Sequence, residues 1–159
     1  MEIGTLVICN SFRNPALLAK MADTVEEISG GRLILGLGAG WNEPEYRAFG
    51  FPFDHRVDRF EEALEIWDLL QTKARITYIG EHYELIDAPF EPKSSQGKLP
   101  VLIGGTKPRM MRLVAKYADI WNSVGDLDEA GTASKNLDKA CLAMGRDPET
   151  LVRSVSRRS

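Results

Sequence analysis

Two glycine-rich segments hold the residue types best suited to binding a ligand. One of them, Gly104-Gly105-Thr106, follows the short apolar run 100–103 and precedes a sequence typical of a helix. Two bare backbone N–H groups, a hydroxyl and the helix dipole would meet there, and this combination favours a phosphate. A tight turn with Thr106 as the helix N-cap explains the same residues equally well.

The other glycine segment contains Gly36, Gly38 and Gly40 and ends an uninterrupted apolar run. We interpret the run as a buried parallel strand that opens into a loop whose backbone a ligand approaches closely. The dinucleotide-binding pattern is excluded, because its third glycine would fall on Trp41. The alternative is that the glycines only allow strand, loop and helix to pack tightly.

Aromatic side chains follow this segment and could form a rim for a flat, apolar ring system that carries a phosphate tail. For any single one of them, a local hydrophobic plug under a long loop is the better hypothesis. The aromatic residues are Trp41, Tyr46, Phe49, Phe51 and Phe53.

The titratable residues give little indication of catalysis. Glu43 and Glu45 could face the site, although acids in loops are mostly solvated. His55 and His82 are lone histidines on polar segments, for which surface or capping roles are expected. The pattern indicates no metal site, and no catalytic residue can be named.

Composition excludes several classes of protein. The chain has 159 residues, of which 43% are hydrophobic and 27% charged, as in an ordinary globular domain. A net charge of -3 argues against nucleic acid as a partner. Cys9 and Cys141 lie far apart and have no metal spacing with the histidines, so we expect core residues in a reducing compartment. No signal peptide or apolar run near 18 residues is seen, which predicts a cytoplasmic protein without a membrane partner.

Strand and helix patterns alternate along the chain, which predicts an α/β fold with a parallel sheet and crossover helices. Asn14 caps a helix that begins at Pro15, and Asp58 is expected to cap another. Residues 41–55 are predicted to be a long loop or short irregular helix. The expected strands are 2–8, 32–37, 100–103, 119–124 and 151–155, and the expected helices are 15–28, 59–71, 107–118 and 128–144. A hairpin is predicted at 77–85, within an insertion, 75–99, whose last part, 88–99, leaves the core.

Several runs of residues closely resemble the luciferase-like monooxygenase family. They are 4–7, 12–20 and 29–41, followed in order by 45–46, 59–70, 100–106 and 118–122. The resemblance covers nearly the whole chain. It is specific for the family and not for one substrate.

The resemblance implies a partial (β/α)8 TIM barrel, about strands three to seven, that binds FMN or the deazaflavin coenzyme F-420. The strand end at Leu6 and Val7 would back the cofactor ring, in family members often through a non-proline cis peptide. The cofactor would also lie along Gly38, Ala39, Gly40 and Trp41, and its phosphate would be held by Ile103, Gly104, Gly105 and Thr106. Trp41 stands where some deazaflavin-dependent dehydrogenases of sugar phosphates carry an acid.

A complete barrel of this type needs roughly 250 residues. We therefore expect residues 1–159 to form a single incomplete barrel domain. Much of the substrate pocket, and often a catalytic histidine, would belong to units that this chain lacks. The expected partners are a small-molecule substrate and either further copies of the chain or a chain that supplies the other strands.

The hypothesis is a flavin- or F-420-dependent oxidoreductase or monooxygenase. Residues 8–14 and the Gly-Ala-Gly-Trp run at 38–41 resemble the deazaflavin-using members of the family more than the luciferases, and this resemblance favours F-420 over FMN. The alternative is a catalytically inactive, shortened paralogue that serves as a cofactor-binding or assembly module.

Overall fold

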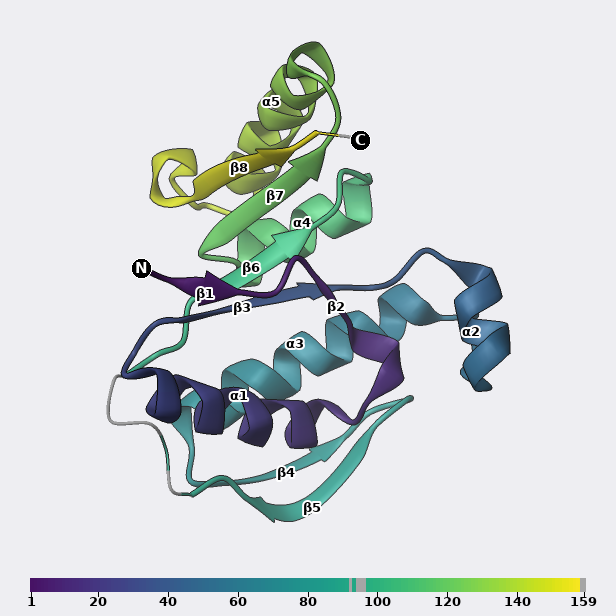
Figure 1. Ribbon diagram of the computed structural model, residues 1–159, viewed down its shortest axis with the longest axis vertical. Coiled ribbons are helices and arrows are strands. Elements are labelled where there is room, and N and C mark those ends of the chain that lie inside the picture. Colours follow the sequence, from purple (N-terminus) through teal and green to yellow (C-terminus); the bar gives the residue numbers. More distant parts are fainter. Residues whose placement is uncertain (92, 94–96, 158–159) are drawn as a thin grey trace. The chain divides into compact units, whose positions relative to one another are not determined.

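The computed structural model describes residues 1–91, 93 and 97–157, and these form two compact units (Figure 1). The first unit comprises Met1–Ile3, Ile8–Leu33 and Gly38–Leu99, and the second comprises Gly4–Val7, Ile34–Leu37 and residues from Pro100 onward. Residues 92 and 94–96 of the predicted excursion lie outside the described residues.

Parallel strands form the centre of the second unit. The strands β3 (Leu33–Gly38), β6 (Val101–Gly104), β7 (Ile120–Val124) and β8 (Val152–Ser156) are neighbours in this order. The register places Leu37 beside Ile103, and Ile103 beside Trp121. The strands β3 and β6 are almost entirely apolar, as is typical of buried parallel strands, whereas β7 and β8 also carry polar residues. The predicted parallel sheet is confirmed.

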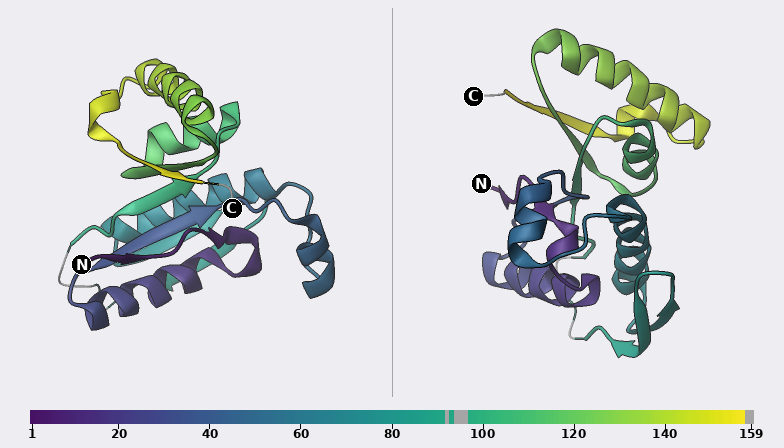
Figure 2. Two further views of the ribbon diagram at one scale, coloured as in Figure 1. Left: turned by 45° about the horizontal axis from the view of Figure 1, so that its top comes forward. Right: turned by 90° about the vertical axis from the view of Figure 1, so that its right-hand side faces the viewer.

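Two helices cover one face of β6, β7 and β8, as both views in Figure 2 show. They are α4 (Pro108–Tyr117) and α5 (Leu127–Ala143), and η2 (Pro148–Thr150) leads from α5 into β8. The Arg146 guanidinium donates hydrogen bonds to the carbonyl oxygens of Ala115 and Ala118, at the end of α4. Cys141 is fully buried on α5, as the sequence predicts.

The strand predicted over residues 2–8 is wrong in its extent. Two short strands, β1 (Ile3–Gly4) and β2 (Ile8–Cys9), replace it, and both pair with β3. Between them the Thr5 hydroxyl donates to the Gly36 carbonyl oxygen at 2.9 Å and accepts from the Gly36 N–H at 3.0 Å. The Thr5 side chain therefore bonds to the N–H and carbonyl groups of Gly36, which the backbone of a continuous strand would otherwise have bonded.

Helices and a hairpin form the first unit. The helix α3 (Arg56–Thr72) packs against α1 (Pro15–Ser29) and against β4 (Arg75–Ile79). The strand β5 (Glu84–Pro89) pairs antiparallel with β4, so the predicted hairpin is confirmed. The chain also forms η1 (Asn10–Phe12). Within residues 41–55, for which a long loop or short irregular helix is predicted, it forms the short helix α2 (Glu43–Phe49).

Helix capping follows the prediction at one position and departs from it at two. The Asn14 side chain accepts hydrogen bonds from the N–H groups of Ala16 and Leu17, as expected. Asp58 lies inside the first turn of α3, because that helix begins at Arg56. Thr106 likewise is not a cap, since Lys107 occupies the N-cap of α4 without a side-chain bond.

The apolar residues of α1 point in two directions. Leu18, Ala19 and Ala22 are buried, whereas a second apolar row is exposed in the described structure: Leu17, Met21, Val25 and Ile28. No described helix is long and apolar enough to cross a membrane.

The close approach of Thr5 to β3 predicts the effect of a methyl group at Gly36. A Cβ there would lie 1.8 Å from the Thr5 carbonyl oxygen, which is backbone and cannot move aside. We expect Gly36→Ala to lower the free energy of unfolding by at least about 2 kcal/mol in urea denaturation.

The matched control is Gly131→Ala, on α5, where nothing lies within 4 Å of the added Cβ. That change should raise stability by about 0.5–1 kcal/mol, since alanine favours a helix over glycine. Equal stabilities of the Gly36→Ala variant and the wild type would contradict the packing described here.

Candidate functional site

The second unit brings three of the predicted cofactor residues together: Leu6, Val7 and Gly104. The Leu6–Val7 peptide bond is cis, as the resemblance implies. A Cβ built on Gly104 would lie 3.7 Å from Val7 Cγ1, so the end of β6 lies against this peptide. The side chains of Leu6 and Val7 are 63% and 39% exposed, and they present an apolar surface beside a residue without a side chain.

The end of β6 offers fewer free backbone groups than the sequence indicates. The Gly105 N–H donates to the Asn122 carbonyl oxygen at 3.4 Å, and the Gly105 carbonyl accepts from Trp121 Nε1 at 2.9 Å. The expectation of two bare N–H groups is therefore wrong at Gly105. Ile103 is fully buried, so its side chain packs in the core. Gly105 has φ near +128°, which only glycine adopts easily.

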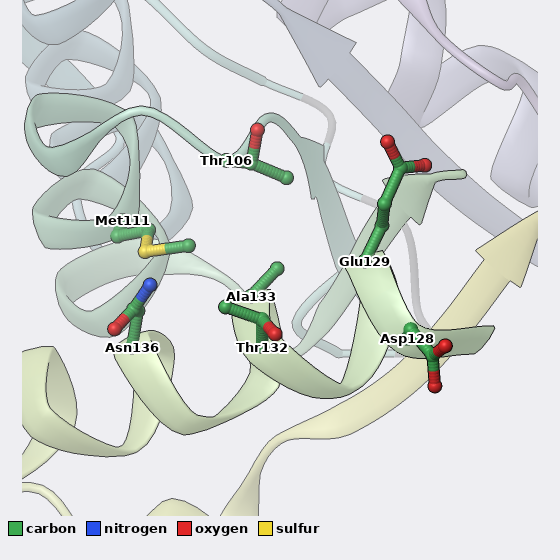
Figure 3. A pocket seen from close by; sticks show the side chains of 7 residues that line it. All are labelled: Thr106, Met111, Asp128, Glu129, Thr132, Ala133 and Asn136. Carbon is green, nitrogen blue, oxygen red and sulfur yellow. The ribbon is translucent and has the colours of Figure 1, made fainter. Parts of the chain in front are cut away.

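Thr106 lies at the edge of an open hollow of about 480 Å³ in the second unit (Figure 3). Thr106 precedes the N-cap of α4, Lys107, and lines the hollow beside the start of that helix. The opposite wall carries Asp128 and Glu129, and Glu129 is engaged in the capping box of α5 with Asp126. The carboxylates of Asp128 and Glu129 repel an anion, so a phosphate would contact only the Thr106 side of the hollow. The lining residues are Thr106, Met111, Asp128, Glu129, Thr132, Ala133 and Asn136.

A polar cluster that sequence reasoning missed runs from the middle of β7 to the C-terminal end of β8. Asn122 is buried, and its Oδ1 accepts hydrogen bonds from the hydroxyls of Ser154 at 2.8 Å and Ser156 at 3.3 Å. Ligands of parallel α/β proteins bind at this end of the strands. The available signal was the polar pair Asn122 and Ser123 inside a strand whose other residues are apolar.

In the first unit the segment Gly38 to Trp41 is held by bonds within the chain. The Tyr46 hydroxyl donates to the Ala39 carbonyl oxygen at 2.8 Å and lies 3.1 Å from Cys9 Sγ. Arg56 Nε donates to the Gly40 carbonyl oxygen at 3.1 Å. A Cβ on Gly40 would lie 2.0 Å from the Tyr46 oxygen, so tight internal packing alone accounts for this glycine.

The predicted aromatic rim is mostly a packed cluster. Tyr46 is 1% exposed, and its ring lies 5.1 Å from that of Phe53 and 4.9 Å from that of Phe12. Phe51 packs on Phe12 as well, at 5.0 Å. The hydrophobic plug is therefore the correct interpretation for these residues. Trp41, at 84% exposed, and Phe49 keep accessible ring surface.

The titratable residues also differ from expectation. Glu43 and Glu45 are solvated as expected, and Glu43 forms an ion pair with Arg47 at 2.9 Å. The two histidines are not isolated, because the rings of His55 and His82 lie 5.6 Å apart. A turn of the hairpin brings them together, which sequence spacing does not reveal.

Comparison with known proteins identifies the class. The family model for luciferase-like monooxygenases matches residues 1–158, and the chain belongs to this family. The pyrimidine monooxygenase RutA of Allorhizobium ampelinum is 31% identical over 84% of this chain and 39% of its own length. The F-420-dependent glucose-6-phosphate dehydrogenase of Amycolatopsis mediterranei is 36% identical over 74% of this chain and 35% of its own.

A solved structure confirms the fold class. The coenzyme F-420-dependent tetrahydromethanopterin reductase from Methanopyrus kandleri superimposes with a TM-score of 0.86 at 19% identity. The match covers 98% of this chain and 49% of that one, a TIM barrel of the luciferase-like type. This chain thus spans about half of that structure and less than half of the relatives' length.

The buried hydroxyl of Tyr46 gives a testable pH dependence. Burial, together with the hydrogen bond between Tyr46 and Cys9, raises the pKa of Tyr46 to about 12. Because the unfolded pKa is about 10, the neutral phenol stabilises the fold below pH 10, and this contribution is lost as the pH rises towards 12. We expect the Tyr46→Phe variant to lack this part of the alkaline destabilisation, as measured by urea unfolding across that range.

Near neutral pH, Tyr46→Phe should cost about 1–3 kcal/mol, because the buried Ala39 carbonyl loses its donor. The comparison variant Ser11→Ala removes only the Ser11 hydroxyl, which lies 3.0 Å from the Tyr46 hydroxyl. This change should lower the free energy of unfolding by less. If Tyr46→Phe is as stable as the wild type at every pH, the Ala39 bond has no structural role.

Proposed function

We propose that this chain binds a ring cofactor with a phosphate tail, F-420 in preference to FMN, as part of an oxidoreductase. One observation carries the proposal: the exposed apolar pair Leu6 and Val7 lies beside the side-chain-free end of β6 within one unit. Such a surface suits a flat heteroaromatic ring better than a polar ligand. The names of the F-420-dependent relatives support the choice of cofactor.

The residues present fit such a group at the ring end. A Cβ on Gly104 would contact Val7. Because Gly104 has no side chain, room is left there for the ring to approach Leu6 and Val7. The Thr106 hydroxyl and the N-terminus of α4 are the groups suited to the phosphate. When bound, the cofactor supplies hydride transfer or, for FMN with oxygen, oxygen insertion, and the chain supplies binding and orientation.

The first unit would contribute through Trp41 rather than through its glycines. The Trp41 side chain is exposed and apolar, whereas the Ala39 and Gly40 carbonyls are already bonded to Tyr46 and Arg56. We keep Gly38, Ala39, Gly40 and Trp41 as proposed cofactor contacts. A small-molecule substrate, and either a second copy or another chain of the same fold, are proposed partners.

Fluorescence titration of the 159-residue chain with F-420, and separately with FMN, tests the proposal. We expect micromolar binding, tighter for F-420. Thr106→Glu should weaken it at least tenfold, because a carboxylate would face the phosphate in place of a hydroxyl. Thr106 is preferred to Gly105 for this test, since any side chain at Gly105 would be strained and would lie 3.2 Å from Met110 Cβ.

Thr24→Glu, an exposed threonine on α1, is the matched control and should leave the dissociation constant unchanged. Wild-type affinity in Thr106→Glu would refute the phosphate assignment, and binding of neither cofactor would refute the proposal. Oxidation of the reduced cofactor by a dye, followed in the same samples, separates an enzyme from a cofactor-binding module.

A further inference from the structure

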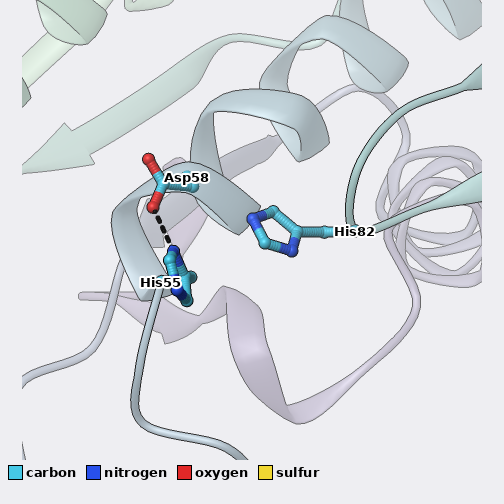
Figure 4. Close-up of side chains that lie close together, drawn as sticks. All are labelled: His55, Asp58 and His82. Carbon is cyan, nitrogen blue, oxygen red and sulfur yellow. Dashed lines mark hydrogen bonds and ion pairs between the residues drawn. The ribbon is translucent and has the colours of Figure 1, made fainter.

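Two side chains at the start of α3 and one from the hairpin turn lie close together in the first unit (Figure 4). His55 is the N-cap of α3, Asp58 lies in its first turn, and His82 comes from the turn between β4 and β5. His55 Nδ1 lies 3.0 Å from Asp58 Oδ2. One nitrogen or oxygen atom from each residue lies within 4.8 Å of the others.

The inward nitrogen of His82 lacks a partner. Its Nε2 is buried and makes no hydrogen bond within the described part of the chain, and Figure 4 shows the ring directed towards Asp58 and His55. Buried polar atoms in proteins are nearly always satisfied. A ligand that accepts the imidazole lone pair would satisfy this one.

The backbone of His82 is fixed by contacts outside the cluster. The Glu62 carboxylate, from α3, accepts hydrogen bonds from the N–H groups of Glu81, His82 and Tyr83 at 2.8–3.2 Å. A Cβ on Gly80 would lie 2.3 Å from Glu62 Oε2, so the glycine makes room for this carboxylate. His82 is therefore held against α3 before any ligand binds.

We propose that His55, Asp58 and His82 bind a divalent transition metal ion. Two imidazoles and one carboxylate are the donor set preferred by Zn²⁺, Co²⁺ and Fe²⁺, with the remaining coordination positions left to water. Bonds of about 2.0–2.1 Å require the ligand atoms to approach to roughly 3–3.5 Å. The His55 side chain is more than half exposed, so its ring can turn to close this gap.

Nearby cations do not oppose the ion, because each has its own partner. Arg59 pairs with Asp54, and Arg56 binds the Gly40 carbonyl and lies over the Phe53 ring at 4.3 Å. Asp54 and Glu62 add negative charge to the surroundings of the cluster. The bound ion would join the hairpin turn to the start of α3, two segments that are distant in sequence.

The test measures binding of Zn²⁺ to the 159-residue chain by competition with a chromophoric chelator, and the visible spectrum of the Co²⁺ form. We expect one site per chain. His82→Gln should weaken binding at least tenfold, and so should His55→Asn, which keeps a residue that tolerates the positive φ at this position. Zn²⁺ should also raise the melting temperature of the wild type but not that of His82→Gln.

Asp68→Asn is the matched control, since this exposed carboxylate on α3 is ten residues from Asp58 and is not a proposed ligand. Its affinity for Zn²⁺ should equal that of the wild type. If a histidine variant fails to fold, Asp58→Asn, in the half-buried first turn of α3, gives the same tenfold expectation. Absence of binding, or binding that these substitutions leave unchanged, would overturn the proposal.

Discussion

The contact between Thr5 and Gly36 is the constraint on which the predicted cofactor surface depends. Thr5 uses its hydroxyl for both hydrogen-bonding groups of Gly36, and its own carbonyl oxygen occupies the space where a side chain would start. The chain can pass this close to β3 only at a glycine. The next two residues, Leu6 and Val7, leave the strand there and present apolar side chains at the end of β6. Without this contact between Thr5 and Gly36, the segment from β1 to β2 would continue as one ordinary strand.

The order of strands and helices could be predicted because each element carries its own local signal. Asn14 and Pro15 start α1, and the apolar runs at β3 and β6 have the continuous hydrophobicity of strands covered on both faces. The first strand was less predictable, because the hydroxyl of Thr5 competes with the backbone for Gly36. Two cap positions were also wrong: Asp58 and Thr106 are good caps by type, but the N-caps are His55, three residues before Asp58, and Lys107, one residue after Thr106.

The candidate site was predictable only in part. Family resemblance led to Leu6, Val7, Gly104 and Gly105, and the structure brings Val7 against Gly104. The family resemblance could not show that the Gly105 N–H is already bonded to the Asn122 carbonyl, since Asn122 lies on the neighbouring strand. His55 and His82 are 27 positions apart, so their approach depends on the path of α3 and the hairpin. Residue types alone could not reveal it.

The carboxylate of Glu62 binds the backbone N–H groups of the hairpin turn and not the side chains of that turn. Three successive N–H groups bind to it, and every residue except proline has that group. The turn can therefore change its side chains during evolution, and with them the chemistry that it presents, while its attachment to α3 persists. What must stay constant is Glu62 itself and the glycine at position 80, which leaves space for it.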